Sequence, residues 1–217
     1  MEIVENLIKI SENIPENVSL IAVSKTKSKN YIELAYNHGQ RDFGENKVQE
    51  LVEKYNSLQK DINWHMIGHL QRNKVKQIAP FVYLIHSVDS YRLLIEINKQ
   101  GLKNGRIINV LVQIDISNDN TKFGFTYAEF DELTKLNKLK DLKNINLKGM
   151  MGMASFSSDL SIIEKEFNQL NDFYNKHKTN LSLNILSMGM SGDYKIAIKC
   201  NSNMIRLGST IFGTRIK

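Results

Sequence analysis

The sequence has a single cysteine, Cys200, only two prolines, and no long apolar run. One cysteine excludes an intrachain disulfide, which fits a reducing compartment. Pro15 and Pro80 are far apart and no Ser/Gly/Pro-rich linker divides the chain, so we expect one domain over residues 1–217. No basic segment followed by an apolar one marks the N-terminus, and no stretch is long enough to span a bilayer. These absences predict a cytoplasmic protein without a membrane partner.

Basic residues are in excess, with 29 Lys and Arg against 23 Asp and Glu, which gives a net charge of +6. Such a charge can indicate a nucleic acid or a phosphorylated ligand as the partner. The lysines are spread along the whole chain beside acidic residues, and no basic stretch is interleaved with aromatic residues. This spread favours solvated helix faces over a nucleic-acid interface. A basic module that binds RNA or protein stays as an alternative.

Apolar spacing divides the chain into strands and helices that alternate strictly. Strands are expected at 19–25, 42–43, 64–67, 83–86, 109–116, 146–151, 183–188 and 204–207. Helices are expected at 2–14, 31–38, 47–55, 73–81, 90–99, 127–139, 161–177 and 193–198, with a last segment at 209–213. Strict alternation implies a parallel sheet with helical crossovers. Eight units predict an α/β fold, a single (β/α)8 TIM-type barrel with an extra N-terminal helix.

An open doubly wound sheet is the alternative fold. It usually carries a Gly-rich turn after its first strand, whereas residues 25–28 hold no glycine. In a barrel, functional side chains lie at the C-terminal ends of the strands. The first expected strand places Ile21, Val23 and Lys25 on one face. Lys25 is then either a strand-end cation that reaches water or an amine held in a pocket, and this stretch alone favours the first interpretation.

The loops after the seventh and eighth strands change that balance. Segments 187–192 and 206–210 are rich in Ser, Thr and Gly, which make turns but also bring hydroxyls and backbone amides to an anion. Barrels often bind phosphate at these two loops. Lys25, across the barrel mouth, would be partly desolvated, which lowers the pKa of an amine and makes it nucleophilic. This combination suits pyridoxal 5′-phosphate (PLP) or a phosphorylated sugar in a lysine-type aldolase, and Arg206 could face a pyridine nitrogen.

Six motifs, in order along nearly the whole chain, carry a family resemblance. They are Ala22–Lys27, Phe43–Asn46, Trp64–Gln71, Lys122–Gly124, Leu186–Ser191 and Arg206–Arg215. The chain resembles the YggS/PROSC proteins, the pyridoxal phosphate homeostasis proteins of the alanine racemase N-terminal-domain-like class.

The resemblance implies a role for each matching residue. Lys25 matches the lysine that forms the internal aldimine with PLP. Ser191 and the pair Gly208–Ser209 match the residues that hold the phosphate. Arg206 matches the arginine that faces the pyridine nitrogen, and Asn46 matches an asparagine near the cofactor. Two positions depart from the family pattern without removing a cofactor contact: Ser28 replaces a usual proline, and Gly192 replaces Asp or Ala.

Arg206 also indicates what the site does. An arginine stays protonated, so it should keep the pyridine nitrogen unprotonated and make the ring a poor electron sink. The related racemases add a second domain and a partner subunit, whereas this chain ends at Lys217. We therefore expect a monomeric carrier that buffers PLP, serves vitamin B6 and amino/keto acid homeostasis and hands PLP to apo enzymes, without strong catalysis. The alternative is a small PLP-dependent racemase or deaminase that uses the same lysine.

The remaining polar and bulky residues have structural interpretations. His65 and His86 are expected to be packed and hydrogen-bonded, although both could line the barrel mouth. His38, His69 and His177 are expected to be exposed. Buried positions are expected for Cys200, for Trp64 and for the methionines of segment 150–153. No spacing of His, Cys or Asp predicts a metal site.

Overall fold

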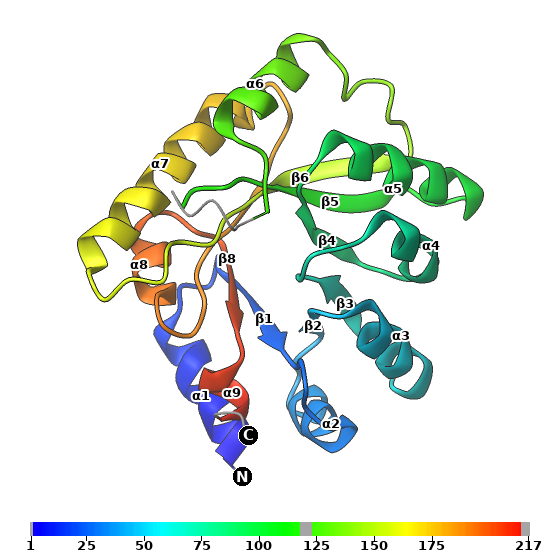
Figure 1. Ribbon diagram of the computed structural model, residues 1–217. Helices are drawn as coiled ribbons and strands as arrows, with labels where there is room; N and C mark the ends of the chain where they lie inside the picture. Colours follow the sequence, from blue (N-terminus) through cyan, green and yellow to red (C-terminus); the bar gives the residue numbers. More distant parts are fainter. Residues whose placement is uncertain (1, 118–122, 214–217) are drawn as a thin grey trace.

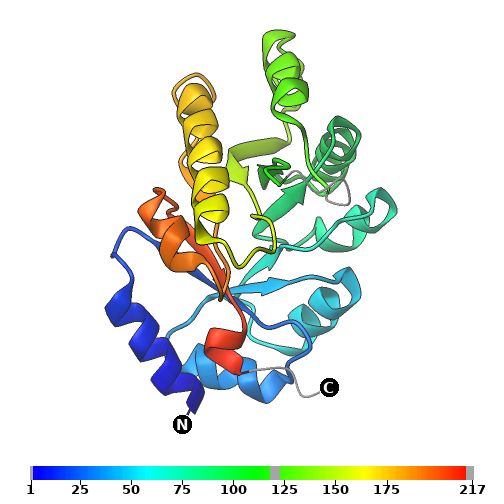
Figure 2. The same cartoon turned by 60° about the vertical axis from the view of Figure 1, so that its left-hand side comes forward.

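Eight parallel strands form a closed barrel in the computed structural model, which describes residues 2–117 and 123–213 (Figures 1 and 2). Each strand pairs with its neighbour in sequence, and β8 closes the ring against β1. Helices cover the outside of the ring, as right-handed crossovers between parallel strands require (Figure 2). The expected (β/α)8 barrel with an N-terminal helix is confirmed. Lys122, Thr214 and Arg215, from the sequence motifs, lie outside the described residues.

The strands are β1 (Ser19–Val23), β2 (Asp42–Glu45), β3 (Asn63–Met66), β4 (Leu84–Val88), β5 (Ile108–Gln113), β6 (Ile145–Met151), β7 (Ile185–Ser187) and β8 (Met204–Leu207). The helices are α1 (Glu2–Asn13), α2 (Lys29–Asn37), α3 (Val48–Ser57), α4 (Val75–Ile78), α5 (Tyr91–Lys103), α6 (Tyr127–Lys135), α7 (Leu160–Lys178), α8 (Tyr194–Lys199) and α9 (Ser209–Phe212). A 3₁₀ turn, Arg72–Lys74, precedes α4.

The core has two parts. The larger one lies between the barrel and its helices and includes Phe43, Trp64, Phe130 and Phe167, all buried. The smaller one fills the barrel interior with Ile21, Leu84, Leu111, Met151 and Met204. The expected burial of Trp64 and Cys200 is confirmed, and so is that of Met150 and Met151. Met153 is only half-buried, although it packs against the cluster inside the barrel. Within the described residues, no helix combines the length and hydropathy that crossing a membrane requires.

The extra helix α1 packs beside α2 and α9, near the end of the described chain (Figure 1). The Asn6 amide donates a hydrogen bond of 3.1 Å to the carbonyl oxygen of Ile211, which joins α1 to α9. Because α9 is a single turn of four residues, it covers little of the barrel. The N-terminal helix therefore supplies the apolar surface that the eighth unit lacks.

Several elements end earlier than their apolar runs suggest. β5 stops at Gln113 and not at 116, because Phe125 folds back there, and its N–H donates to the carbonyl oxygen of Gln113 at 2.8 Å. α6 stops at Lys135 and not at 139, since Asn137 adopts a left-handed conformation (φ 53°) that ends a helix. β1 stops at Val23, two residues before Lys25. That last difference shapes the functional site.

Candidate functional site

A pocket of about 520 Å³ opens at the C-terminal ends of β1, β2 and β8. Its lining includes all six residues singled out from the sequence, namely Lys25, Asn46, Ser191, Arg206, Gly208 and Ser209. The rest of the lining is largely apolar and includes Ile67, Met153 and Met190. Residues from opposite ends of the chain thus meet in one cavity, as the barrel topology predicts.

Lys25 lies in a turn, so the expected strand over 19–25 is two residues too long. Val23 and Lys25 nevertheless both line the pocket, as the expected shared face predicts. The next residue, Thr26, has a left-handed backbone (φ 65°), which a β-branched residue adopts at a cost. This turn leaves Lys25 half-buried in the pocket wall. Because the turn has no glycine at this position, contacts with other parts of the protein must stabilise the left-handed backbone of Thr26.

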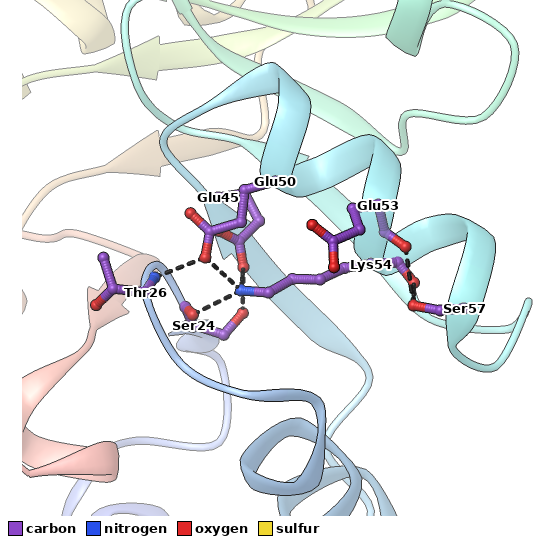
Figure 3. A network of polar contacts seen from close by, with 7 residues as sticks. All are labelled: Ser24, Thr26, Glu45, Glu50, Glu53, Lys54 and Ser57. Carbon is purple, nitrogen blue, oxygen red and sulfur yellow. Dashed lines mark hydrogen bonds and ion pairs between the residues drawn. The ribbon is translucent and has the colours of Figure 1, made fainter.

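A buried ionic cluster holds both peptide groups beside Lys25 (Figure 3). The Lys54 ammonium, from α3, donates to the carbonyl oxygen of Ser24 at 2.8 Å and to carboxylate oxygens of Glu45 and Glu50 at 2.7 Å each. Glu50 in turn accepts the N–H of Thr26 at 2.6 Å. Residues from β2 and α3 therefore fix the Lys25 turn from both sides.

Glu45 is fully buried at the centre of this cluster. Burial raises the pKa of Glu45 to about 7, while Lys54 and the Ser24 hydroxyl, which donates to Glu45 at 2.6 Å, pull it down. Its second carboxylate oxygen has no hydrogen-bond partner within the described chain. Sequence reasoning missed Glu45, Glu50 and Lys54 as site residues. The i,i+4 spacing of Glu50 and Lys54 on α3 was visible in the sequence, but their target, the turn at 24–26, was not.

Asn46 follows Glu45 at the end of β2 and lines the pocket. A Cβ atom on Gly68 would collide with the Asn46 backbone, so only a glycine allows the end of β3 to pass so close. The buried side-chain oxygen of Asn46 has no hydrogen-bond partner in the described part of the protein. A buried, unsatisfied acceptor at a pocket wall indicates a missing ligand or water.

The two Gly/Ser-rich loops meet on the opposite wall. The Ser191 hydroxyl oxygen accepts the N–H of Gly208 at 3.2 Å and that of Thr210 at 3.3 Å. Gly189 has φ 92°, and a Cβ atom there would lie 2.7 Å from the Cβ of Ala197, so the first loop requires glycine. A hydroxyl and converging backbone N–H groups are the donors that an anion such as phosphate needs.

Arg206 is buried on β8 at the pocket floor. Its guanidinium donates to the carbonyl oxygen of Ser187 at 2.9 Å, to the Ser187 hydroxyl at 2.6 Å and to the carbonyl oxygen of Gly152 at 3.2 Å. Burial lowers its pKa to about 10, so Arg206 stays protonated at neutral pH, as expected from the sequence. None of the described carboxylates forms an ion pair with it.

These groups define the chemistry that the pocket supports. Lys25 supplies a primary amine that can attack a carbonyl carbon. The Ser191 and Gly208 loops supply donors for an anion, and Arg206 supplies a fixed cation at the floor. The pocket thus suits a small ligand with a carbonyl group and a phosphate. Among the described residues, no group of three His, Cys, Asp or Glu side chains could hold a metal ion.

The histidines fall into two groups. His65 and His86 are fully buried and hydrogen-bonded to each other at 2.9 Å, so the packed interpretation is confirmed. His38 and His69 are exposed, as expected. The expected exposure of His177 is wrong, because its ring packs against Phe130 and Phe173 and bonds to Asp131 at 2.8 Å. Asp131 lies 46 residues away, so no local pattern marks this contact.

Nearly the whole chain matches known proteins. Residues 2–216 match the family described as alanine racemase, N-terminal domain. The chain is 37% identical over 211 residues to the pyridoxal phosphate homeostasis protein of Synechocystis sp., with 96% of each chain covered.

Solved structures show a similar barrel. PipY of Synechococcus elongatus, solved with PLP bound, has a TM-score of 0.89 and 32% identity, covering 97% of this chain and 100% of PipY. Alanine racemase of Clostridium difficile has a TM-score of 0.81 at 17% identity, a likeness of fold alone, and this chain covers 57% of it.

Proposed function

Because the chain belongs to the pyridoxal phosphate homeostasis proteins, within the alanine racemase N-terminal domain family, we propose that it binds PLP in the pocket at the C-terminal end of the barrel. One observation carries the proposal: the amine of Lys25 and the donors around Ser191 line the same 520 Å³ cavity. The protein serves PLP homeostasis, and the whole chain, residues 1–217, acts as one PLP-binding domain.

Each wall of the pocket has its own role in this proposal. Lys25 holds the cofactor covalently, as a Schiff base. Ser191, Gly208 and Ser209 bind the phosphate through hydroxyls and backbone N–H groups. Asn46 contacts the ligand from β2. The unsatisfied oxygen of Asn46 supports the fit, since a polar ligand would satisfy it. The N–H groups of Gly208 and Thr210 support it as well, because they converge on Ser191 and a phosphate would accept them there.

Arg206 determines what the bound cofactor can do. PLP supplies an electron sink, and that sink is strongest when its ring nitrogen is protonated. A guanidinium with a pKa of about 10 donates hydrogen bonds and does not give up its proton at neutral pH, so beside the ring nitrogen it favours the unprotonated form. The site then stores PLP and does not use it. We propose a monomeric cytoplasmic carrier without strong catalysis, which releases PLP to apo enzymes.

Absorbance spectroscopy tests the binding site. The protein mixed with PLP should show a visible band that borohydride removes, Lys25→Ala should abolish it, and Lys29→Ala, on the surface beside Glu53 at 3.7 Å, should leave it intact. A band that survives in Lys25→Ala would refute the covalent role. The carrier role is tested separately, because sustained turnover of amino acids that depends on Lys25 would contradict it while leaving PLP binding in place.

A further inference from the structure

A chain of hydrogen bonds runs behind Arg206 through the interior of the barrel. The guanidinium bonds to the Ser187 hydroxyl on β7 at 2.6 Å, and Ser187 lies 3.3 Å from Nδ1 of His86 on β4. Nε2 of His86 lies 2.9 Å from Nδ1 of His65 on β3. Nε2 of His65 lies 3.0 Å from the carboxylate of Asp42, at the start of β2.

The proton positions along this chain follow from its two ends. A guanidinium can only donate, so the Ser187 oxygen accepts from Arg206 and its own proton points to Nδ1 of His86. A neutral His86 then carries its proton on Nε2 and donates to Nδ1 of His65. His65 in turn carries its proton on Nε2 and donates to Asp42, whose ionised carboxylate can only accept. Both ends impose the same direction, so every bond points from Arg206 to Asp42.

The surroundings support this arrangement. Ser187, His65 and His86 are 0% exposed, whereas the side chain of Asp42 is 35% exposed. Burial, reinforced by His65 and Arg206, keeps the pKa of His86 well below 6.5, so His86 is neutral as the chain requires. Within the described residues, no carboxylate lies within hydrogen-bonding distance of Arg206. The carboxylate of Asp42, at the other end of the chain, is separated from it by four hydrogen bonds. Aligned dipoles thus compensate a buried cation.

We infer that His65 and His86 are positioning residues for Arg206: they relay the charge of Asp42, at the opposite end of the barrel, to the guanidinium on the pocket floor. The geometry of the relay stands independently of any ligand. Its effect on bound PLP rests on the proposed function. The two are therefore tested separately.

Nitrogen NMR of the ligand-free protein at pH 7.5 tests the relay itself. Long-range ¹H–¹⁵N spectra report which nitrogen of a neutral histidine carries the proton. We expect Nε2–H for both buried histidines. An Nδ1–H form of His86 would overturn the proposal, since Ser187 could not then donate to it.

Asp42→Ala tests the direction of the relay and changes a side chain that is 35% exposed, outside the buried core. Without the carboxylate at Nε2 of His65, only the Arg206 end still favours this direction. We therefore expect the Nε2–H forms of His65 and His86 to become a mixture with the Nδ1–H forms. Asp89→Ala is the matched control, because Asp89 bonds to His69 at the same distance of 3.0 Å but outside the chain. It should leave His65 and His86 unchanged. Equal spectra in Asp42→Ala and wild type would overturn the proposal.

PLP dissociation gives the functional readout. We expect Asp42→Ala to release PLP about 3- to 10-fold faster than wild type, an effect typical of coupled side chains in one network. Asp42→Glu should restore most of the retention. Release at the wild-type rate, with the histidine protons shifted, would refute the coupling to the pocket while leaving the relay in place. If no variant binds PLP, the proposed function fails, and the NMR result still decides the relay.

Discussion

The two sides of the pocket are stabilised by different physics. On the Lys25 side, a buried ammonium, Lys54, pairs directly with two carboxylates at 2.7 Å (Figure 3). On the Arg206 side, a buried guanidinium bonds only to carbonyls and a hydroxyl, and the imidazoles of His86 and His65 continue the chain. Both sides hold one buried cation in place, Lys54 on helix α3 and Arg206 on strand β8.

This difference predicts how the stability of each side responds when a charged group is removed. A directly paired buried charge becomes costly when one partner is removed, because the other stays uncompensated. A cation held by neutral dipoles leaves no stranded charge when it is removed, only unsatisfied acceptors. The Lys25 side should therefore respond strongly to charge removal and to pH, and the Arg206 side much less.

The largest expected effect comes from Lys54→Met at pH 8. This substitution leaves the buried carboxylate of Glu45 without its cation and the carbonyl oxygen of Ser24 without its donor. The free energy of unfolding, measured by denaturant titration, should therefore fall by about 3–5 kcal/mol. The loss should be smaller at pH 6, where Glu45 takes up a proton. Lys29→Met is the control, since the Lys29–Glu53 pair is 44% and 71% exposed and contributes less than about 1 kcal/mol. Similar losses in both variants would contradict the ionic account.

The pH dependence is the next effect in size. The pKa of Glu45 is about 7 in the folded protein and near 4.5 unfolded, so the folded state holds this proton more tightly. Its favourable contribution is fully present below pH 4.5 and is lost as the pH rises through 7, a change of about 3 kcal/mol.

Glu45→Gln cannot ionise and should flatten the unfolding free energy between pH 5 and pH 8 relative to wild type. Glu53→Gln, at a position 71% exposed, should keep the wild-type slope. Parallel profiles for wild type and Glu45→Gln would show that Glu45 does not titrate in this range.

The smallest effect on stability is expected from Arg206→Met. It removes a buried charge, which is favourable, but leaves the carbonyls of Ser187 and Gly152 without their donors. The net loss should be about 1–2 kcal/mol in the same denaturant titration. A loss as large as that of Lys54→Met would mean that the two sides do not differ, and the comparison would fail.

Local patterns predicted much of the architecture. The alternation of short apolar runs and amphipathic helices is enough for an eight-stranded barrel, because each unit has one way to pack onto its neighbour. The order of strands and helices along the chain predicts that Lys25, Ser191 and Arg206 lie at or near the C-terminal ends of β1, β7 and β8. Because these ends surround the barrel mouth, the sequence also predicted that the three residues line one pocket.

Contacts between distant segments could not be foreseen. The turn at Thr26 has no glycine or asparagine to mark its left-handed backbone, and the residues that stabilise it, Glu50 and Lys54, lie on another helix. His177, on α7, is buried because Asp131 and Phe130 on α6 pack against it. Packing decides such details, and a single sequence gives no sign of which helix faces will touch.

Reduction of the PLP-loaded protein with borohydride, followed by peptide mass mapping, tests the central claim most directly. We predict one adduct, on Lys25, in the peptide that also contains Lys27. Fragmentation of that peptide separates the two lysines. An adduct on Lys27, or adducts spread over surface lysines with Lys25 unmodified, would contradict the assignment of Lys25 as the residue that holds the cofactor.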